Sequence, residues 1–236
     1  MWGRRLLFLC VIMVAMLSCF REEILPVDGT ASISQDVKYI ALTFDDGPRL
    51  GTTDRLLDGL KERGASATFF LVGEEIEKYP ELVKRMQAEG HQIGNHTWSH
   101  ARLEQADEAM LAQEVGATER LLDKILGGGD YWLRPPYGLI SSEIESLIEV
   151  PMVKWSVDPR DWESRDEEKV TAAILEAVTP NSIILLHDIY PTSVDAALNV
   201  VDRLEKEGYL FVTVAELLRL NGVQPQDGVL YRTGTG

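Results

Sequence analysis

Two adjacent carboxylates, Asp45 and Asp46, close an apolar run and are followed by a glycine-proline turn. Neighbouring carboxylates repel each other, and a metal ion or another cation beside them removes that repulsion. The alternative is an ordinary turn in which an aspartate caps backbone amides. The pair by itself leaves a metal site and an ordinary turn equally open.

Two imidazoles four residues apart, His96 and His100, follow another apolar run. On a helical turn this spacing would place both rings on one face. With one carboxylate they would form a ligand set suited to zinc or another divalent transition metal, leaving positions for water and substrate. A histidine pair is a weak signal alone, but the chain has only 4 histidines and two of them are here.

A rigid segment, Arg-Pro-Pro-Tyr-Gly at residues 134–138, ends a further predicted strand. Its two prolines fix the backbone, so the amides that follow point in a set direction. Such a loop can present the Arg134 guanidinium to a carboxylate and the Tyr137 N–H to an oxyanion. A stiff surface turn with an ordinary arginine is the alternative.

The last two clusters are Asp-Pro-Arg-Asp-Trp at residues 158–162 and Leu-Leu-His-Asp at residues 185–188. The first could equally form an exposed turn whose tryptophan packs on the domain. In the second, an apolar strand ends at His187, whose near-neutral imidazole can serve as an acid or a base. A core histidine that Asp188 satisfies is the alternative there.

The elements that must position these groups are short β-rich runs that alternate with amphipathic helices. The predicted strands span residues 39–44, 67–72, 92–94, 132–134, 152–157, 182–186 and 209–212. The predicted helices span residues 52–63, 81–89, 107–126, 166–177 and 193–207, and a capping box of Thr213 and Glu216 begins a last helix.

This alternation predicts an α/β fold with a parallel sheet, either a barrel or an open doubly wound sheet. Seven strand candidates favour a distorted, incomplete (β/α) barrel with about seven parallel strands. The polar clusters come directly after predicted strands, and in parallel α/β folds that end of the sheet carries the active site.

The first 19 residues are interpreted as a signal peptide or lipoprotein leader, because two arginines precede a short apolar run at residues 6–17. Ser18 precedes Cys19, as in a bacterial lipoprotein processing site. Lipid attachment at Cys19, cleavage without lipid and an uncleaved leader that anchors the chain to a membrane all remain open. Residues 20–36 are expected to form a linker, residues 37–220 the catalytic domain and residues 221–236 a C-terminal tail.

The composition, 45% hydrophobic and 26% charged, is that of an ordinary globular protein. Both cysteines lie in the leader, so the mature domain has no disulfide and no cysteine-ligated metal. The net charge of -15 argues against nucleic acid and anionic membrane surfaces as partners. We expect an extracytoplasmic monomer, located in the periplasm, in the cell envelope or outside the cell.

In their order along the chain, the five clusters resemble the motifs of the polysaccharide deacetylases of carbohydrate esterase family four. Thr-Phe-Asp-Asp-Gly-Pro at residues 43–48 and His-Thr-Trp-Ser-His at residues 96–100 are the most specific matches, and the resemblance covers residues 37–218. It implies a metal-dependent hydrolase that removes N-acetyl groups from N-acetylglucosamine-containing polysaccharide, first peptidoglycan and next chitin oligomers. Acetyl xylan or another O-acetylated carbohydrate, a small non-sugar amide and a non-catalytic glycan-binding role are the alternatives.

The resemblance also implies roles for the acidic and imidazole groups. Asp46, His96 and His100 would bind one divalent transition metal, zinc first, with cobalt, nickel or manganese as alternatives. Asp45 would act as the catalytic base. His187 would act as the acid that protonates the leaving amine.

The same resemblance assigns the residues around these groups. Arg134 would pair with the catalytic base and orient it, and Asp161 would support either that arginine or the protonated acid. The Tyr137 backbone N–H would stabilise the oxyanion. Trp162 and Leu185 would form the wall of the pocket that receives the acetyl methyl.

Overall fold

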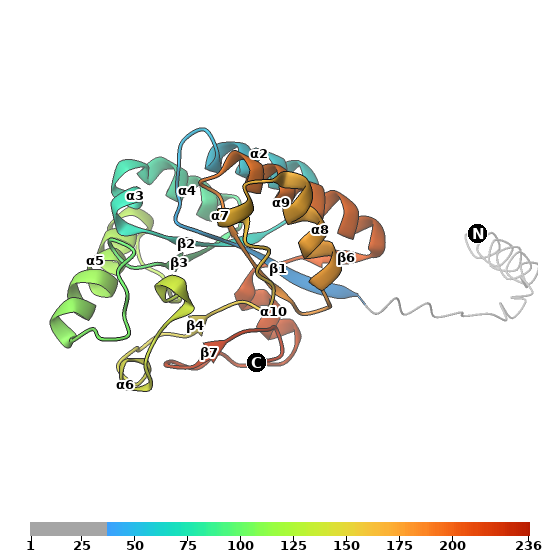
Figure 1. Ribbon diagram of the computed structural model, residues 1–236. Helices are drawn as coiled ribbons and strands as arrows, with labels where there is room; N and C mark the ends of the chain where they lie inside the picture. The colour runs from blue at the N-terminus through green and yellow to red at the C-terminus, as the bar shows by residue number, and fades with distance from the viewer. Residues whose placement is uncertain (1–36) are drawn as a thin grey trace, which may run out of the picture. The chain divides into compact units, whose positions relative to one another are not determined.

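The computed structural model describes residues 37–236, and the predicted leader and linker, residues 1–36, lie outside the described residues. The described chain forms an α/β fold in which every pairing between its named strands is parallel (Figure 1). Its strands are β1 (Lys38–Asp45), β2 (Ala67–Leu71), β3 (Gln92–Asn95), β4 (Met152–Val153), β5 (Ile183–His187), β6 (Tyr209–Phe211) and β7 (Leu230–Tyr231).

The main sheet has five strands in the order β3-β2-β1-β5, with β6 also paired to β1, and β4 pairs with β7 in a second, two-stranded sheet. Isolated parallel bridges continue this arrangement. Leu133 bridges Asn95 at the end of β3 and Met152 in β4, and Val157 bridges Ile184 in β5. The result is a distorted, incomplete barrel, which confirms the predicted fold class.

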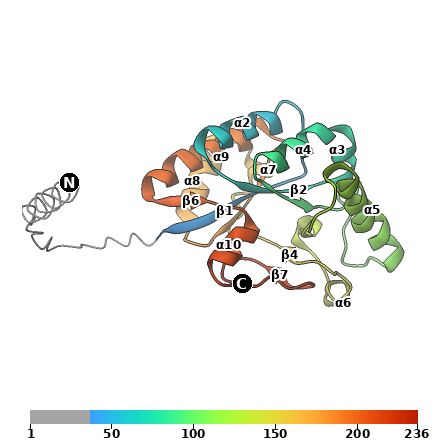
Figure 2. The same cartoon turned by 180° about the vertical axis from the view of Figure 1, so that it is seen from behind.

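Helices cover the sheet on both faces, with α2 and α9 on one side and α10 on the other, as both views show (Figures 1 and 2). The helices are α2 (Thr53–Arg63), α3 (Gly73–Lys78), α4 (Pro80–Ala88), α5 (Glu108–Leu126), α6 (Ser142–Glu145), α7 (Asp161–Ser164), α8 (Glu167–Ala177), α9 (Pro191–Leu204) and α10 (Val214–Leu220). Within residues 37–236, no helix has both the length and the apolar character that a membrane span requires.

The central strand β1 is buried on both faces, as expected for a parallel sheet covered by helices. Ile40, Leu42 and Phe44 belong to the core cluster shared with α2 and α9, whereas Ala41 belongs to the cluster shared with α10. A fully buried side chain of this size contributes about 1.5–3 kcal/mol. This burial holds β1 in place, and the two adjacent carboxylates, Asp45 and Asp46, lie at its carboxyl end.

The C-terminal segment departs from the prediction of a separate tail. Strand β7 lies within residues 221–236, pairs with β4 and buries Tyr231. The predicted domain boundary at residue 220 therefore falls inside the fold. A two-residue strand has no periodicity of its own, and only its pairing with β4 defines it. Residues 132–134, predicted as a strand, likewise form only the isolated bridges at Leu133.

Candidate active site

The carboxyl ends of the central strands bring the predicted clusters together. Asp45 ends β1 in register with His187 at the end of β5, and β3 ends at Asn95, directly before His96. Eight of the predicted site residues line one pocket, and Arg134 and Asp161 lie fully buried beside it. The pocket is lined by Asp45, Asp46, His96, His100, Tyr137, Trp155, Asp158, Trp162, Leu185 and His187.

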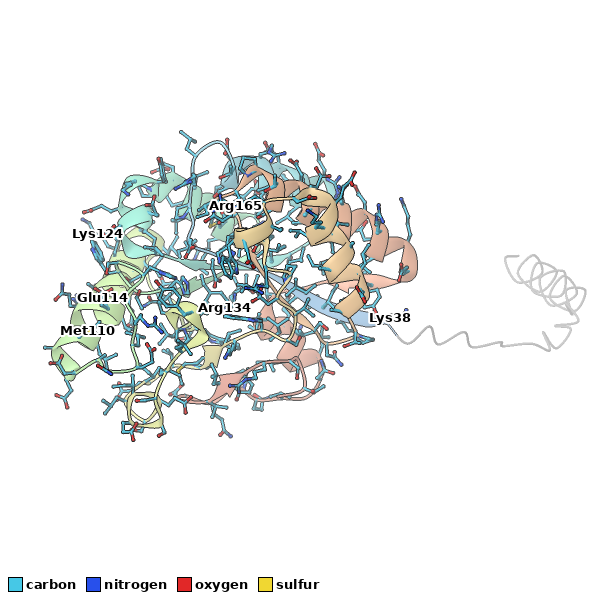
Figure 3. The ribbon with its side chains drawn as sticks, in the orientation of Figure 1. Lys38, Met110, Glu114, Lys124, Arg134 and Arg165 are labelled. Atoms are coloured by element: carbon cyan, nitrogen blue, oxygen red, sulfur yellow. The ribbon has the colours of Figure 1, made fainter. Side chains whose placement is uncertain are left out.

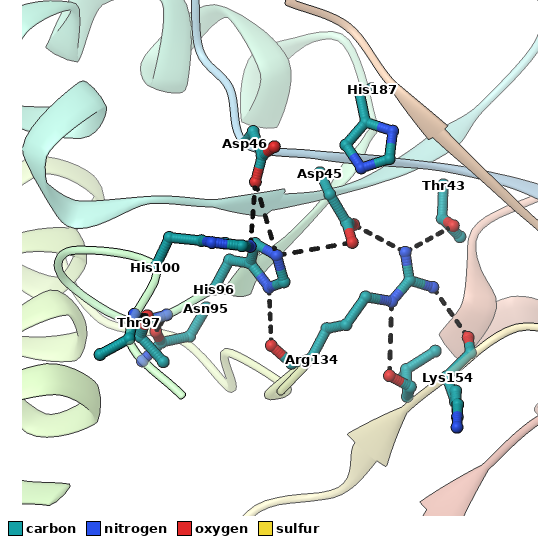
Figure 4. Close-up of polar contacts among 12 residues, drawn as sticks. Thr43, Asp45, Asp46, Asn95, His96, Thr97, His100, Arg134, Lys154 and His187 are labelled. Atoms are coloured by element: carbon teal, nitrogen blue, oxygen red, sulfur yellow. Dashed lines mark hydrogen bonds and ion pairs between the residues drawn. The ribbon is translucent and has the colours of Figure 1, made fainter. Parts of the chain in front are cut away.

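Three of these residues, Asp46, His96 and His100, form a group that could hold a metal ion, with one ligand atom from each lying within 4.8 Å of the others. Asp46 Oδ1 lies 3.6 Å from His96 Nε2 and 3.5 Å from His100 Nε2 (Figure 4). Ligands bound to one tetrahedral zinc at about 2.0–2.1 Å lie roughly 3.3 Å apart. Asp46 Oδ1 is buried and has no hydrogen-bond partner among residues 37–236. The residues therefore fit such an ion.

The two imidazoles present different supporting contacts. His96 Nδ1 lies 2.7 Å from the carbonyl oxygen of Arg134. A carbonyl only accepts, so Nδ1 carries the proton and the Nε2 lone pair faces Asp46. Burial, and next the neighbouring His96, lower the pKa of His100. A lowered pKa favours the neutral imidazole that a metal requires.

The segment that carries both histidines is a loop and not the helical turn on which their spacing would place both rings on one face. Thr97 and His100 adopt left-handed backbone conformations with φ of 68° and 60°. The side chain of Asn95 accepts from the Thr97 N–H at 2.9 Å, a local bond that competes with helix formation. Left-handed conformations cost non-glycine residues roughly 1–2 kcal/mol each. The loop therefore depends on contacts elsewhere for its shape.

Asp45 is held by a buried arginine. The Arg134 Nη1 donates to Asp45 Oδ1 at 2.7 Å and to the Thr43 hydroxyl at 2.8 Å (Figure 4). Its Nε and Nη2 donate to the carbonyls of Val153 and Lys154. Burial lowers the pKa of Arg134 and Asp45 opposes this, but a guanidinium stays charged in proteins. The ion pair fixes one oxygen of Asp45.

His187 is supported by Asp161, one of the two partners predicted for that aspartate. His187 Nδ1 lies 2.9 Å from Asp161 Oδ1, and the His187 N–H donates to Asp161 Oδ2 at 2.8 Å. The Ser193 hydroxyl donates to the same oxygen at 2.6 Å. Burial opposes a charge on His187, but the hydrogen bond to Asp161 and nearby carboxylates outweigh it and raise the pKa of His187 to about 9. His187 is therefore protonated at neutral pH.

The rim and floor of the pocket contain the predicted substrate-binding residues. Tyr137 and Trp162 are exposed, at 54% and 43%, whereas Leu185 is buried on β5. The centroid of the Tyr137 ring lies 4.7 Å from the centroid of the His100 ring. The Tyr137 backbone is left-handed, with φ of 61°. Trp155 and Asp158 also line the pocket, and the sequence interpretation gave neither of them a role.

Two further titratable side chains, His91 and Asp188, are buried but do not line the pocket. His91 lies outside the five sequence motifs and accepts from the Ala67 N–H, and burial lowers its pKa to about 4. Asp188 accepts from the Thr53 hydroxyl, and burial raises its pKa to about 7. His187 is hydrogen-bonded by Asp161, so the alternative of a core histidine satisfied by Asp188 does not describe this site.

Comparisons with known proteins agree with this geometry. Residues 32–150 match the family described as polysaccharide deacetylase. The chain is 37% identical to the peptidoglycan-N-acetylmuramic acid deacetylase PdaC of Bacillus subtilis, covering 84% of this chain and 42% of that protein. It is 38% identical to the peptidoglycan-N-acetylglucosamine deacetylase PgdA of Listeria monocytogenes, covering 76% of this chain and 39% of that protein.

Among solved structures, the T48 deacetylase with substrate superimposes with a TM-score of 0.79 at 41% identity. That similarity covers 83% of this chain and 97% of the T48 chain. The chain thus spans less than half the length of the two peptidoglycan deacetylases named above, but nearly all of this solved structure. The chain belongs to the polysaccharide deacetylase family.

Proposed function

We propose that this protein is a metal-dependent hydrolase that removes N-acetyl groups from N-acetylglucosamine-containing polysaccharide and releases acetate. The observation that carries the proposal is the convergence of three groups at one pocket. These are the candidate metal ligands, a carboxylate paired with a buried arginine, and a histidine paired with its own carboxylate. Peptidoglycan is the substrate proposed first, since PdaC and PgdA are named for it, and chitin oligomers come second.

The ion proposed for Asp46, His96 and His100 is Zn²⁺, because two imidazoles and one carboxylate with open positions are typical of catalytic zinc. Co²⁺, Ni²⁺ and Mn²⁺ suit the same ligands and are the alternatives. When bound, the ion polarises the amide carbonyl and lowers the pKa of water.

The protein groups then handle the protons. Asp45 accepts a proton from the attacking water through the oxygen that Arg134 leaves free, since Arg134 occupies Oδ1. An amine leaves readily only when protonated, and His187 donates the proton from Nε2 while Asp161 holds Nδ1. The Tyr137 N–H contributes to stabilising the tetrahedral oxyanion.

Binding and location complete the proposal. Leu185 and Trp162 form apolar walls that receive the acetyl methyl, since both line the pocket. The protein acts outside the cytoplasm as a monomer, attached to a membrane through a lipid at Cys19 or an uncleaved leader, or released. The apolar run at residues 6–17 and Cys19 support this location.

Acetate release by the purified full-length chain tests the proposal. The substrates are peptidoglycan, N-acetylglucosamine oligomers and acetyl xylan, each assayed before chelation, after chelation and after zinc restoration. We expect release from the N-acetylated substrates that chelation abolishes and zinc restores. Release that survives complete metal removal would contradict the proposal, and release from acetyl xylan alone would identify an esterase.

A further inference from the structure

The segment from His96 to His100, called the histidine loop here, is held from two sides. On one side, the first N–H groups of α3 donate to its carbonyls: Gly73 to Thr97 at 2.9 Å and Glu74 to Trp98 at 3.0 Å. On the other side, its own N–H groups need acceptors. For the N–H groups of Trp98 and Ser99, helix α5 provides the acceptor through a single side chain.

That side chain is Glu114, in the first half of α5 (Figure 3). Its Oε2 accepts from the Trp98 N–H at 3.1 Å and from the Ser99 N–H at 2.9 Å. Its Oε1 accepts from the Ser99 hydroxyl at 3.0 Å. Glu114 is only 6% exposed, and a carboxylate so removed from water requires such donors. Glu114 lies outside the five sequence motifs, because it belongs to helix α5, which follows the histidine loop in the chain.

The position of these contacts matters for the metal site. Trp98 and Ser99 lie between the two histidines, and Thr97 and His100 are in left-handed conformations. The His96 ring is fixed by the Arg134 carbonyl, whereas the His100 ring makes no hydrogen bond within residues 37–236. The placement of His100 therefore depends on its backbone and on the packing of its ring against Tyr137, and Glu114 holds the two residues that precede it.

We propose that Glu114 is a positioning residue of the metal site, acting through the histidine loop to keep His100 Nε2 in reach of the ion that Asp46 and His96 share. This inference rests on the proposed metal site and deepens it. Glu114 is not itself a ligand, since both of its oxygens are occupied by donors of the loop.

The test is the zinc affinity of the full-length metal-free chain, measured by competition with a chromogenic chelator. Glu114→Ala removes all three acceptor contacts, Glu114→Gln keeps one carbonyl oxygen, and Ser99→Ala removes only the hydroxyl contact. Loss of a group that orients a metal ligand weakens affinity by about 10–100-fold, and we expect Glu114→Ala near the lower end. Glu114→Gln and Ser99→Ala should weaken it less.

The matched control is Glu119→Gln, which removes an exposed carboxylate from the same helix and should leave zinc affinity unchanged. In Glu114→Ala, saturating zinc should restore kcat, because the variant lowers only the fraction of the protein that has zinc bound.

Zinc affinity equal to wild type in a folded Glu114→Ala would overturn the inference. Should that variant fail to fold, unchanged affinity in both Glu114→Gln and Ser99→Ala would overturn it. Zinc affinity is measured without turnover, so failure of the proposed deacetylation would be seen separately.

Discussion

The Arg134 guanidinium and the Asp45 carboxylate form a 2.7 Å ion pair in which both side chains are almost fully removed from solvent. Arg134 uses Asp45 Oδ1, whereas Asp45 Oδ2 lies 3.6 Å from His96 Nε2, at the edge of the candidate metal cluster. The arginine thus orients the carboxylate and compensates its charge.

Arg134→Met should lower the free energy of unfolding by about 3–5 kcal/mol, because it leaves the Asp45 charge buried and unpaired. Chemical denaturation of the metal-free full-length chain measures this loss. In the double variant Asp45→Asn/Arg134→Met, the unpaired charge is gone and part of the stability should return. A single variant within about 1 kcal/mol of wild type, the range of exposed ion pairs, would contradict a buried, mutually dependent pair.

Asp161→Asn should shift the alkaline limb of the kcat/KM profile to lower pH. The pKa of His187 is raised to about 9, so the protonated acid is present below that pH and is lost as pH rises through it. Removing the Asp161 charge lowers this pKa because burial still opposes the imidazolium. Steady-state assays across pH at saturating zinc measure the shift.

The control for this prediction is Glu163→Gln on α7, an exposed carboxylate that pairs with Arg160. It should leave the alkaline limb in place. An alkaline limb that stays in place in Asp161→Asn, with the variant folded, would show that His187 is not the group whose deprotonation limits activity.

Leu185→Val should weaken the preference of the pocket for the acetyl group over the larger propionyl group. Leu185 lines the pocket and is 3% exposed, so removing one methylene leaves space beside the acetyl methyl. One methylene in an apolar pocket changes discrimination by about 10–200-fold, and we expect the ratio of N-propionyl to N-acetyl turnover to rise near the lower limit. Competition between the two acylated oligomers measures the ratio, and an unchanged ratio would place the acyl group elsewhere.

Most of the parallel sheet could be predicted from sequence because its strands have strong local signals. Residues 39–44 and 67–72 are apolar runs with one threonine each, and they correspond closely to β1 and β2. The capping box of Thr213 and Glu216 begins α10 as predicted. Strands β4 and β7 are two residues long, so tertiary pairing defines them and local sequence does not.

The residues of the candidate site also fall into a group that could be predicted from sequence and a group that could not. Side chains directly after strands could be predicted, because parallel strands bring their carboxyl ends to one edge. Ser193 and Glu114 could not be predicted, since α9 and α5 place them beside the site only after packing. The two histidines lie on a loop and not on a helical turn, because the Asn95 side chain accepts from the Thr97 N–H and because Thr97 and His100 are left-handed.

The most direct test of the account is a paired measurement of zinc content and acetate release in Asp45→Asn, with His96→Ala for comparison. Loss of a general base lowers kcat by about 10²–10⁴-fold, so Asp45→Asn should retain zinc and lose turnover to this extent. His96→Ala should lose zinc and activity together. Asp45→Asn with full zinc and near wild-type acetate release would contradict the assignment of Asp45 as the base and, with it, the proposed mechanism.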